Sequence, residues 1–386
     1  METTPDTGAV ADSAGPAQRI LFVIDHFRDP HAGTEGQLFH LVQGLDRRRF
    51  DPLLLVFSDS EYLQSGGFPC PYQVLGHRKL SSPATWKALW RKAARLKAEG
   101  YALAHVFFND ASVLCPPVFR LRGIRTLISR RDMGYWYTPG YRLLLRLTGR
   151  FVTGVIANSQ AVKDVTAQQE KLPPERIHVI YNGYDHGDIP PGVSALPVTI
   201  REPDAVLVGL VANIRPIKRI GDAVEAIIRL RENQPPVHLV VIGSGDTRAL
   251  QDQASQGGVA DRVHFLGQRQ DVKNCLRGMH IGLLCSESEG FSNALIEYMQ
   301  AGLAVVCTRA GGNPEAIEPG RHGLLYPVGD WQSLAHCLSS LANDAQLRQR
   351  LGQNALASAR ERFTMEAMVA AHETLYRQLR LPCTGS

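Results

Sequence analysis

Short apolar stretches rich in Val, Ile and Leu alternate with amphipathic helical stretches twice along this chain. This alternation predicts parallel sheets covered by helices. The expected strands of the first series cover residues 19–24, 53–57, 104–107, 126–128, 154–157 and 178–180. Those of the second series cover residues 206–211, 238–242, 263–266, 281–284 and 304–307. The sequence therefore predicts an α/β chain with two doubly wound domains facing a cleft, in which the ligand lies at the carboxyl ends of the strands.

The stretch between the two series contains Pro190, Pro191 and Pro197, which break regular elements. Residues 1–17 are rich in Thr, Asp, Gly, Ala and Pro, which is typical of a disordered tail. A helix near the C-terminus is expected to fold back onto the first domain. The expected division is a tail at 1–17, an N-terminal domain at 18–185, a linker at 186–204, a C-terminal domain at 205–364 and a terminal segment at 365–386.

The composition of the chain limits which kinds of ligand and macromolecule it is expected to bind. The formal net charge of +5 fits an anionic ligand or an acidic membrane surface, and falls short of a nucleic-acid footprint. No stretch reaches the roughly 18 apolar residues that span a bilayer. The seven cysteines contain no C-x-x-C pair and show neither a disulfide framework nor a zinc spacing. We therefore expect a cytoplasmic protein that binds no nucleic acid.

The segment from Glu289 to Glu297 is the strongest site candidate, because two carboxylates bracket a loop and the start of a helix. Leu295, Tyr298 and Met299 give this helix a buried stripe, and Glu297 lies off it, where its carboxylate can accept hydrogen bonds from ribose hydroxyls. Glu289 can reach sugar hydroxyls or stabilise positive charge on a ring. The alternative is an acidic helix turn stabilised by its own dipole. Unpaired amides at the helix start are expected to attract phosphate, and they belong to Phe291, Ser292, Asn293 and Ala294.

Further donor contacts are expected at the ends of neighbouring strands. Arg215 and Lys218 can neutralise a diphosphate, although a solvated basic turn is the alternative. Gly243 belongs to a Gly-Ser-Gly turn that allows close backbone approach. The loop backbone near Leu266 and Val272 could pair with a base edge.

The first domain offers candidates on the acceptor side. The Ala32-Gly33 turn could press against a pyrophosphate, or could simply precede a capped helix. The loop at residues 129–137 holds two cations, an acid and three aromatics, which suits sugar recognition, whereas a structural ion pair is the competing interpretation. The expected acceptor-binding residues of this loop are Arg131, Asp132, Tyr135 and Trp136.

The stretch from Trp86 to Lys97 predicts a basic amphipathic helix with two tryptophans. Such a helix can lie on an anionic membrane. A helix that covers the sheet with its tryptophans is the preferred interpretation.

Together these motifs resemble the retaining glycosyltransferases of family 4, which have the GT-B fold of two Rossmann-like domains. The resemblance extends from Arg19 to about Leu381. It includes the E-x7-E segment at 289–297, and further matches at Ala301-Gly-Leu-Ala-Val-Val306, Gly311-Gly-Asn-Pro-Glu315 and Val179-Ile-Tyr-Asn-Gly183.

The resemblance implies sugar transfer from a nucleotide-diphosphate sugar to a glycan or lipid-linked acceptor, with retention at the anomeric carbon. Glu297 would bind the ribose, and Arg215 and Lys218 the diphosphate, while Glu289 and the backbone of residues 291–294 would hold the sugar. The implied catalytic residues are Arg215, Lys218 and Glu289. The sequence has no D-x-D triplet, so a metal-independent reaction without a cofactor is expected.

The chain departs from the family pattern at two places. It has Ala32-Gly33 where many relatives have a Gly-Gly doublet, and Arg130-Arg131-Asp132 where many have a histidine. The role of that histidine therefore does not transfer. Two alternatives to sugar transfer stay open: a non-transferring GT-B enzyme such as a nucleotide-sugar epimerase, and a silent sugar-nucleotide-binding module.

Overall fold

The computed structural model describes residues 16–30, 33–77, 79–185, 200 and 202–379. The chain forms two compact units. Unit 1 consists of Met1–Ile128, Phe151–Thr153 and Glu373–Ser386, and unit 2 of Ser129–Arg150 and Gly154–His372. Most of the expected tail and linker lies outside the described residues, as do His31 and Ala32.

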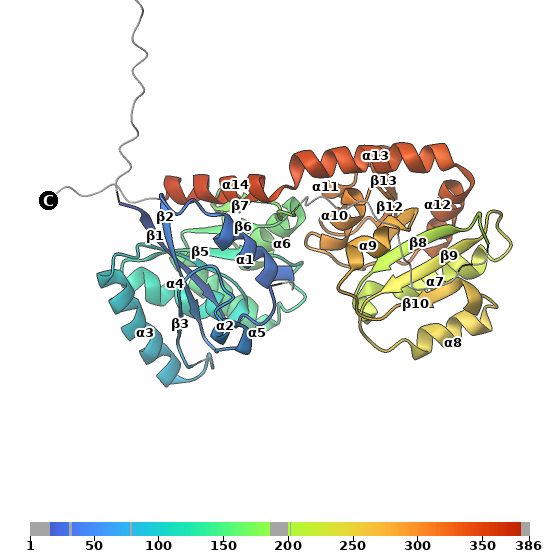
Figure 1. Ribbon diagram of the computed structural model, residues 1–386. Coiled ribbons are helices and arrows are strands. Elements are labelled where there is room, and N and C mark those ends of the chain that lie inside the picture. Colours follow the sequence, from blue (N-terminus) through green and yellow to red (C-terminus); the bar gives the residue numbers. More distant parts are fainter. Residues whose placement is uncertain (1–15, 31–32, 78, 186–199, 201, 380–386) are drawn as a thin grey trace, which may run out of the picture. The chain divides into compact units, whose positions relative to one another are not determined.

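The first sheet of the described chain has seven strands in the order β3-β2-β1-β4-β5-β6-β7 (Figure 1). Its strands are β1 (Gln18–Ile24), β2 (Phe50–Val56), β3 (Tyr72–Val74), β4 (Leu103–Val106), β5 (Arg125–Arg130), β6 (Gly154–Ala157) and β7 (Ile177–Val179). The accompanying helices are α1 (Gly33–Gly44), α2 (Glu61–Gln64), α3 (Pro83–Ala98), α4 (Asn109–Leu121), α5 (Pro139–Thr148) and α6 (Gln160–Glu170). The parallel pairing of β1 with both β2 and β4 marks the point where the strand order reverses.

The second sheet has six described strands in the order β10-β9-β8-β11-β12-β13. They are β8 (Val206–Val211), β9 (Val237–Ile242), β10 (Val263–Phe265), β11 (Ile281–Leu284), β12 (Ala304–Thr308) and β13 (Gly323–Tyr326). The helices are α7 (Ile220–Arg229), α8 (Arg248–Gln256), α9 (Val272–Arg277), α10 (Asn293–Gln300), α11 (Asn313–Ala316), α12 (Trp331–Asn343) and α13 (Ala345–Arg362). Here the order reverses between β8 and β11, so ligands are expected beside the loops that follow these two strands.

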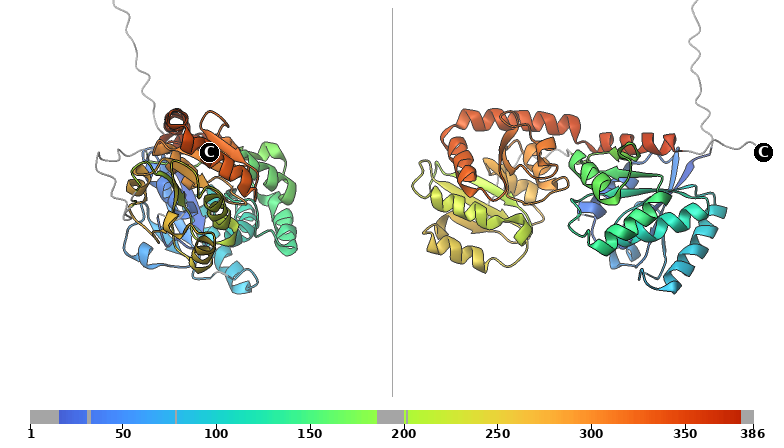
Figure 2. Two further views of the ribbon diagram at one scale, coloured as in Figure 1. Left: turned by 90° about the vertical axis from the view of Figure 1, so that its right-hand side faces the viewer. Right: turned by 180° about the vertical axis from the view of Figure 1, so that it is seen from behind.

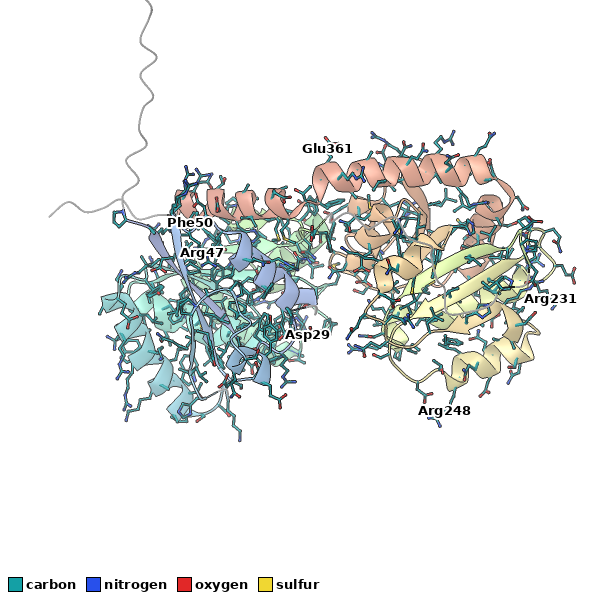
Figure 3. All side chains as sticks on the ribbon, viewed as in Figure 1. Asp29, Arg47, Phe50, Arg231, Arg248 and Glu361 are labelled. Atoms are coloured by element: carbon teal, nitrogen blue, oxygen red, sulfur yellow. The ribbon has the colours of Figure 1, made fainter. Side chains whose placement is uncertain are left out.

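Helices cover both faces of the second sheet. Val208 and Leu210 of β8 pack in one apolar cluster with α7 and α12, whereas Leu207 belongs to a second cluster with α10 and α13. Views from the front and from behind show α13 and α8 on opposite sides of the strands (Figures 1 and 2). Charged side chains such as Arg248 on α8 and Glu361 on α13 point away from the sheet (Figure 3). The predicted doubly wound α/β fold is confirmed.

The last described helix is α14 (Met365–Gln378), whose final residues belong to unit 1 from Glu373 onward. Tyr376 is fully buried there, in edge contact with Phe22 of β1. Its hydroxyl lies 2.7 Å from Nδ1 of His105 on β4. The last turns of α14 therefore contribute to the core around the first strand.

Candidate functional site

The loops after β8 and β11 meet at the point where the second sheet reverses its strand order. A hydrogen bond of 2.9 Å from the amide of Glu287 to the carbonyl of Ile217 joins them. Lys218 ends the 3-10 turn η3 (Pro216–Lys218), and its Nζ lies 2.6 Å from Oε1 of Glu289. The side chains are 26% and 13% exposed, so the ion pair is partly shielded from water. The structure thus brings together two of the three predicted catalytic residues.

Arg215, the third predicted catalytic residue, directly precedes η3 and is exposed. Its guanidinium has no carboxylate partner in the described part of the chain. A free fork of this kind can bind phosphate oxygens in a bidentate manner. Lys218 is instead neutralised by Glu289 until an anion competes for it.

Helix α10 begins with Asn293, and Ser292 occupies its N-cap position without a side-chain capping bond among the described residues. The predicted stripe is confirmed, since Leu295, Tyr298 and Met299 are all buried. The Tyr298 hydroxyl accepts a hydrogen bond from the Val211 amide (2.7 Å) and donates one to the Leu283 carbonyl (3.1 Å). Helix α10 is therefore fixed against β8 and β11, and the uncapped amides at its start favour an anion.

Glu297 lies one turn into α10 and is half-buried. Burial raises the pKa of its carboxyl above the ordinary value, and the charge of Lys273 acts in the opposite direction. No side-chain partner for this carboxylate occurs among the described residues. A carboxylate held without a partner is suited to accept hydrogen bonds from ligand hydroxyls.

The Gly-Ser-Gly turn packs against the loop that carries Arg215. Gly243 has a φ of 153°, and a Cβ there would come 2.0 Å from the carbonyl oxygen of Ala212. Gly245 has a φ of 141°, and its Cβ would come 2.9 Å from the carbonyl oxygen of Ile214. These glycines are therefore required by contact between protein backbones, independently of any ligand.

The remaining predicted donor contacts occupy separate loops. The amide of Leu266 donates to the carbonyl of Val241 (2.9 Å), and Val272 begins α9 directly after an ion pair of 2.7 Å between Arg269 and Asp271. Gly33 begins α1 in unit 1, and its predicted contact with a pyrophosphate stays a prediction.

Close backbone packing shapes the loop that contains Glu289. A Cβ on Gly311 would come 1.8 Å from the carbonyl oxygen of Glu289, and one on Gly312 would come 2.3 Å from that of Gly290. A Cβ on Gly290 itself would come 2.3 Å from the carbonyl oxygen of Arg131. Glycine at these three positions therefore allows the Glu289 loop to lie between two other backbone segments of unit 2.

Arg131 is linked to the start of α10 through a residue that the sequence analysis did not single out. Its Nη2 donates to Oδ1 of Asn182 (2.5 Å), and Nδ2 of Asn182 donates to Oδ1 of Asn293 (3.1 Å). The Tyr184 hydroxyl also donates to Asn293 Oδ1 (2.5 Å). Burial lowers the pKa of Arg131 to about 10, and no carboxylate pairs with it among the described residues. The only sequence signal was the family match at residues 179–183.

The other residues of this loop serve its own structure. Asp132 accepts hydrogen bonds from the Gly134 amide (2.7 Å) and from Trp136 Nε1 (3.0 Å). The competing interpretation placed a structural ion pair around Arg131 and Asp132, whereas the ion pair found here joins the buried side chains of Arg130 and Glu170, with Nε and Oε1 2.6 Å apart. Tyr135 is 79% exposed. Asp132 and Trp136 therefore bond to each other within the loop. Of the four predicted acceptor residues, Arg131 and Tyr135 are the two whose side chains have no such role inside the loop.

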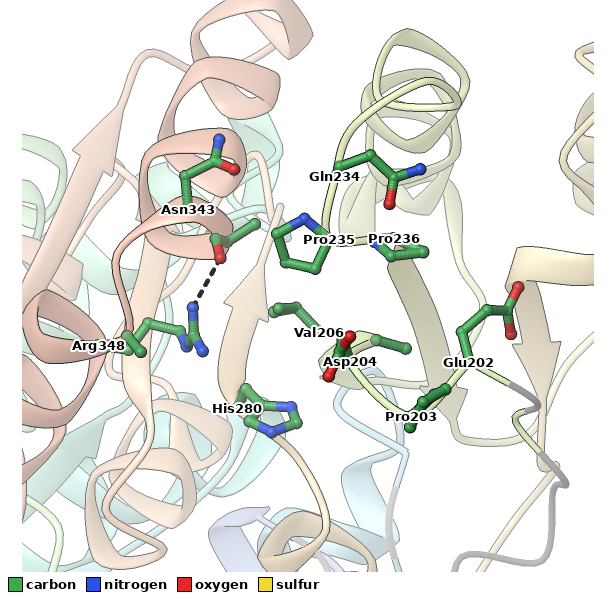
Figure 4. A pocket seen from close by; sticks show the side chains of 13 residues that line it. Glu202, Pro203, Asp204, Val206, Gln234, Pro235, Pro236, His280, Asn343 and Arg348 are labelled. Carbon is green, nitrogen blue, oxygen red and sulfur yellow. Dashed lines mark hydrogen bonds between the residues drawn. The ribbon is translucent and has the colours of Figure 1, made fainter.

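A pocket lies at the opposite edge of the second sheet, beside the amino ends of β8, β9 and β11 (Figure 4). Asp204, His280 and Arg348 are among its lining residues. Arg348 is held there by bonds from Nη1 to the carbonyls of Leu341 (2.5 Å) and Ala342 (2.9 Å). Ligands of doubly wound sheets bind at the carboxyl ends of strands, so this pocket is separate from the candidate site.

Comparisons with known proteins agree with this geometry. The sequence matches the family model "Glycosyltransferase Family 4" over residues 32–188 and "Glycosyl transferases group 1" over residues 198–357. It is 33% identical to the N-acetyl-alpha-D-glucosaminyl L-malate synthase of Bacillus anthracis over 46% of each chain. It is 28% identical to the Vi polysaccharide biosynthesis protein VipC/TviE of Salmonella typhi over 64% of this chain and 44% of that protein. The matches thus span about half the length of these curated relatives.

Solved structures share the fold. Anabaena Alr3699/HepE in complex with UDP superposes with a TM-score of 0.80 at 24% identity, over 93% of this chain and 100% of that one. A glycosyltransferase from Rickettsia africae gives a TM-score of 0.81 at 16% identity, over 94% and 98%. None of the helices in the described part of the chain is both long and apolar enough to cross a membrane. Because the two family models together match most of the sequence and the fold agrees, this chain belongs to the GT-B glycosyltransferases of family 4.

Proposed function

We propose that this protein transfers a sugar from a nucleotide-diphosphate sugar to a glycan or lipid-linked acceptor, with retention at the anomeric carbon. The observation that carries the proposal is the uncapped start of α10, with the Lys218–Glu289 pair before it and the unpartnered Glu297 after it. The names of relatives support a donor of this class. HepE has been solved with UDP-glucose, and VipC/TviE acts in polysaccharide biosynthesis.

The donor would be held by both ends. Glu297 would accept hydrogen bonds from the ribose, and the amides of residues 291–294 would face phosphate or sugar oxygens. Arg215 and Lys218 would bind the diphosphate, and Glu289 would hold Lys218 in place and reach the sugar. Further donor contacts are proposed for Gly33, Gly243, Leu266 and Val272.

In the proposed reaction, the acceptor hydroxyl attacks the anomeric carbon from the same face from which the nucleoside diphosphate leaves. The acceptor oxygen bonds to the anomeric carbon while the bond from that carbon to the diphosphate oxygen breaks. The acceptor's hydroxyl proton passes to the departing phosphate oxygen. Arg215, Lys218 and the α10 amides stabilise the charge that develops on the diphosphate, which is the part that a divalent metal ion plays in other transferases. The reaction is accordingly proposed to need no metal.

On the acceptor side we assign Arg131 and Tyr135 to substrate contact, with Asp132 and Trp136 shaping the loop. A cytoplasmic location, with peripheral contact at a membrane, fits a nucleotide-sugar donor and a lipid-linked acceptor. It is supported by six free cysteines in the described chain, of which Cys115, Cys275, Cys285 and Cys307 are buried.

The test is nucleotide release from UDP-, GDP- and ADP-sugars with and without acceptor, in buffer containing EDTA. One donor should be consumed, with a glycosylated product in equal amount and of retained configuration. Arg215→Ala should lower kcat by about a hundredfold or more, because a cation at the leaving group is lost. Arg231→Ala, an exposed arginine of the same unit, serves as the matched control. Unchanged activity of Arg215→Ala and Glu297→Ala would refute the site, and donor conversion without sugar transfer would indicate an epimerase.

A further inference from the structure

Helix α5 exposes most of its leucines. Leu145 is its one buried residue, whereas Leu143, Leu144 and Leu147 are 59%, 41% and 47% exposed. Single exposed apolar residues are normal on a protein surface, but a cluster within one short helix marks an interaction site. We call Leu143, Leu144 and Leu147 the leucine face of α5.

The leucine face is one continuous stripe. At about 100° per residue, Leu143, Leu147 and Leu144 fall within an arc of roughly 100°. Leu145 lies on the far side of the helix, where it anchors α5 to unit 2. Two arginines attach the flank of the helix to α6, because Arg146 Nε donates to the carbonyl of Gln169 (3.0 Å) and Arg142 Nη1 donates to its Oε1 (3.4 Å). The leucine face is thereby held outward on a fixed support.

The charged residues of α5 itself are all basic. Residues 133–163 contain Arg142, Arg146, Arg150 and Lys163 and no Asp or Glu. A short apolar stripe bordered by arginines matches the surface of an anionic bilayer, in which leucines enter the boundary of the acyl chains while arginines meet the headgroups.

Helix α3, the basic helix that the sequence offered for membrane contact, lacks such a face. Its Leu89, Ala93 and Leu96 are buried. Trp86 donates its indole N–H to the carbonyl of Leu80 (2.8 Å), and Trp90 is covered by the guanidinium of Arg122 at 3.8 Å from the ring centre. The apolar stripe of α3 thus packs on unit 1, as the preferred interpretation expected, whereas Trp90 departs from that interpretation, because it stays 38% exposed beneath Arg122.

We propose that the leucine face of α5 docks the protein onto an anionic lipid surface. This inference rests on the proposed function, because a lipid-linked acceptor would reside in that surface. Docking confines the enzyme to the same lipid surface as such an acceptor, so the two meet more often. The rate of transfer to a water-soluble acceptor should not depend on lipid.

The test is co-sedimentation of the full chain with phosphatidylcholine vesicles, with and without phosphatidylglycerol. Binding should require phosphatidylglycerol and fall with added salt. The triple variant L143S/L144S/L147S should bind at least about tenfold more weakly, because three apolar insertions are lost. Leu121→Ser, which changes a 66% exposed leucine of α4, is the matched control and should bind like the parent.

Other outcomes would overturn the proposal. Equal vesicle binding by the parent and the triple variant would do so, as would equal binding to both vesicle types. A parent that dimerises, and a triple variant that does not, with vesicle binding unchanged, would assign the leucine face to a second copy of the chain. Nucleotide release in the absence of vesicles tests the proposed function separately, and it should be the same for the parent and the triple variant.

Discussion

At the scale of single residues, Glu289 and Glu297 show that the same type of side chain can have different roles at different positions. Glu289 is paired at 2.6 Å with Lys218, so its charge is already balanced. Glu297 has no partner among the described residues, and burial raises the pKa of its carboxyl. The first is suited to orient a cation, and the second to accept hydrogen bonds from a ligand.

The raised pKa of Glu297 predicts a pH dependence of donor binding. The ionised carboxylate accepts hydrogen bonds from two hydroxyls, and a raised pKa means that it becomes protonated at a higher pH than an ordinary glutamate. The KM for the nucleotide sugar should therefore rise as the pH falls into the mildly acidic range. Glu297→Gln should show a high KM at every pH, without this acidic limb.

Initial rates at several donor concentrations across pH measure this effect. Glu232→Gln, which changes an exposed glutamate of the same unit, should retain the parent profile. An acidic limb that persists in Glu297→Gln would assign the titration to another group.

Two neighbouring arginines, Arg130 at the end of β5 and Arg131 directly after it, are predicted to have opposite phenotypes when substituted. Arg131 carries a buried charge without a carboxylate partner among the described residues and is assigned to substrate contact on the acceptor side, so Arg131→Gln should raise the KM for the acceptor by about tenfold. Arg130→Gln breaks the buried pair with Glu170 and should instead lower the free energy of unfolding by about 3–5 kcal/mol.

Initial rates at several acceptor concentrations and denaturant unfolding of both variants separate the two effects. Arg131→Lys should restore the KM for the acceptor only in part, because lysine lacks the planar guanidinium whose Nη2 donates to Asn182. If Arg131→Gln lost stability and kept the parent's KM for the acceptor, Arg131 would be a structural residue like its neighbour.

At the scale of elements, periodicity predicted what depends on local sequence. The stripe of α10 and the long strands follow from apolar spacing, and the structure confirms them. Strands β3 and β13 were not predicted. Strand β3 has three residues and β13 has four, of which the first is glycine, so neither is long enough to show an apolar periodicity. Asn182 was missed because its bonds to Arg131 and Asn293 join residues far apart in sequence. The glycines at 290, 311 and 312 were quoted as motif letters, and only the structure shows which carbonyls require them.

Helix α6 depends on a cap from α11, which is distant in the sequence. Both carboxylate oxygens of Glu315 accept backbone amides at the helix start, from Gln160 (2.7 Å) and Ala161 (2.8 Å). The Tyr181 hydroxyl donates to the same carboxylate at 3.0 Å. Glu315→Ala should therefore lower the free energy of unfolding by about 1–3 kcal/mol, because charge-assisted bonds are lost.

Glu318→Ala provides the comparison in denaturant unfolding. Glu318 is exposed, and within the described part of the chain its carboxylate pairs only with Arg321 three residues away, so the change should be below about 0.5 kcal/mol. Equal effects of the two substitutions would show that Glu315 contributes no more than a surface glutamate.

At the scale of the whole molecule, the chain order and the contact units differ. The sequence predicted two successive domains, since strands and helices repeat in two series. A helix near the C-terminus was also expected to fold back onto the first domain, and unit 1 includes residues from Glu373 onward, more than three hundred positions after the first strand. Apolar periodicity alone does not show which core such a helix covers, because a helix that packs on a distant core has the same periodicity as one that packs locally.

This organisation predicts that stability and donor binding can be changed independently. Tyr376 belongs to unit 1 and is fully buried against Phe22, with its hydroxyl 2.7 Å from His105 Nδ1. Tyr376→Ala should lower the free energy of unfolding by about 3–5 kcal/mol, because a large cavity opens. Tyr376→Phe removes only the hydroxyl and should lower the free energy of unfolding by about 1–2 kcal/mol.

Glu297 and Lys218 lie in unit 2, so the affinity of the folded variants for the nucleoside diphosphate should match that of the parent. Denaturant unfolding and calorimetric titration of the same samples measure both quantities, and a Tyr376→Phe variant with weakened nucleotide binding would contradict their independence.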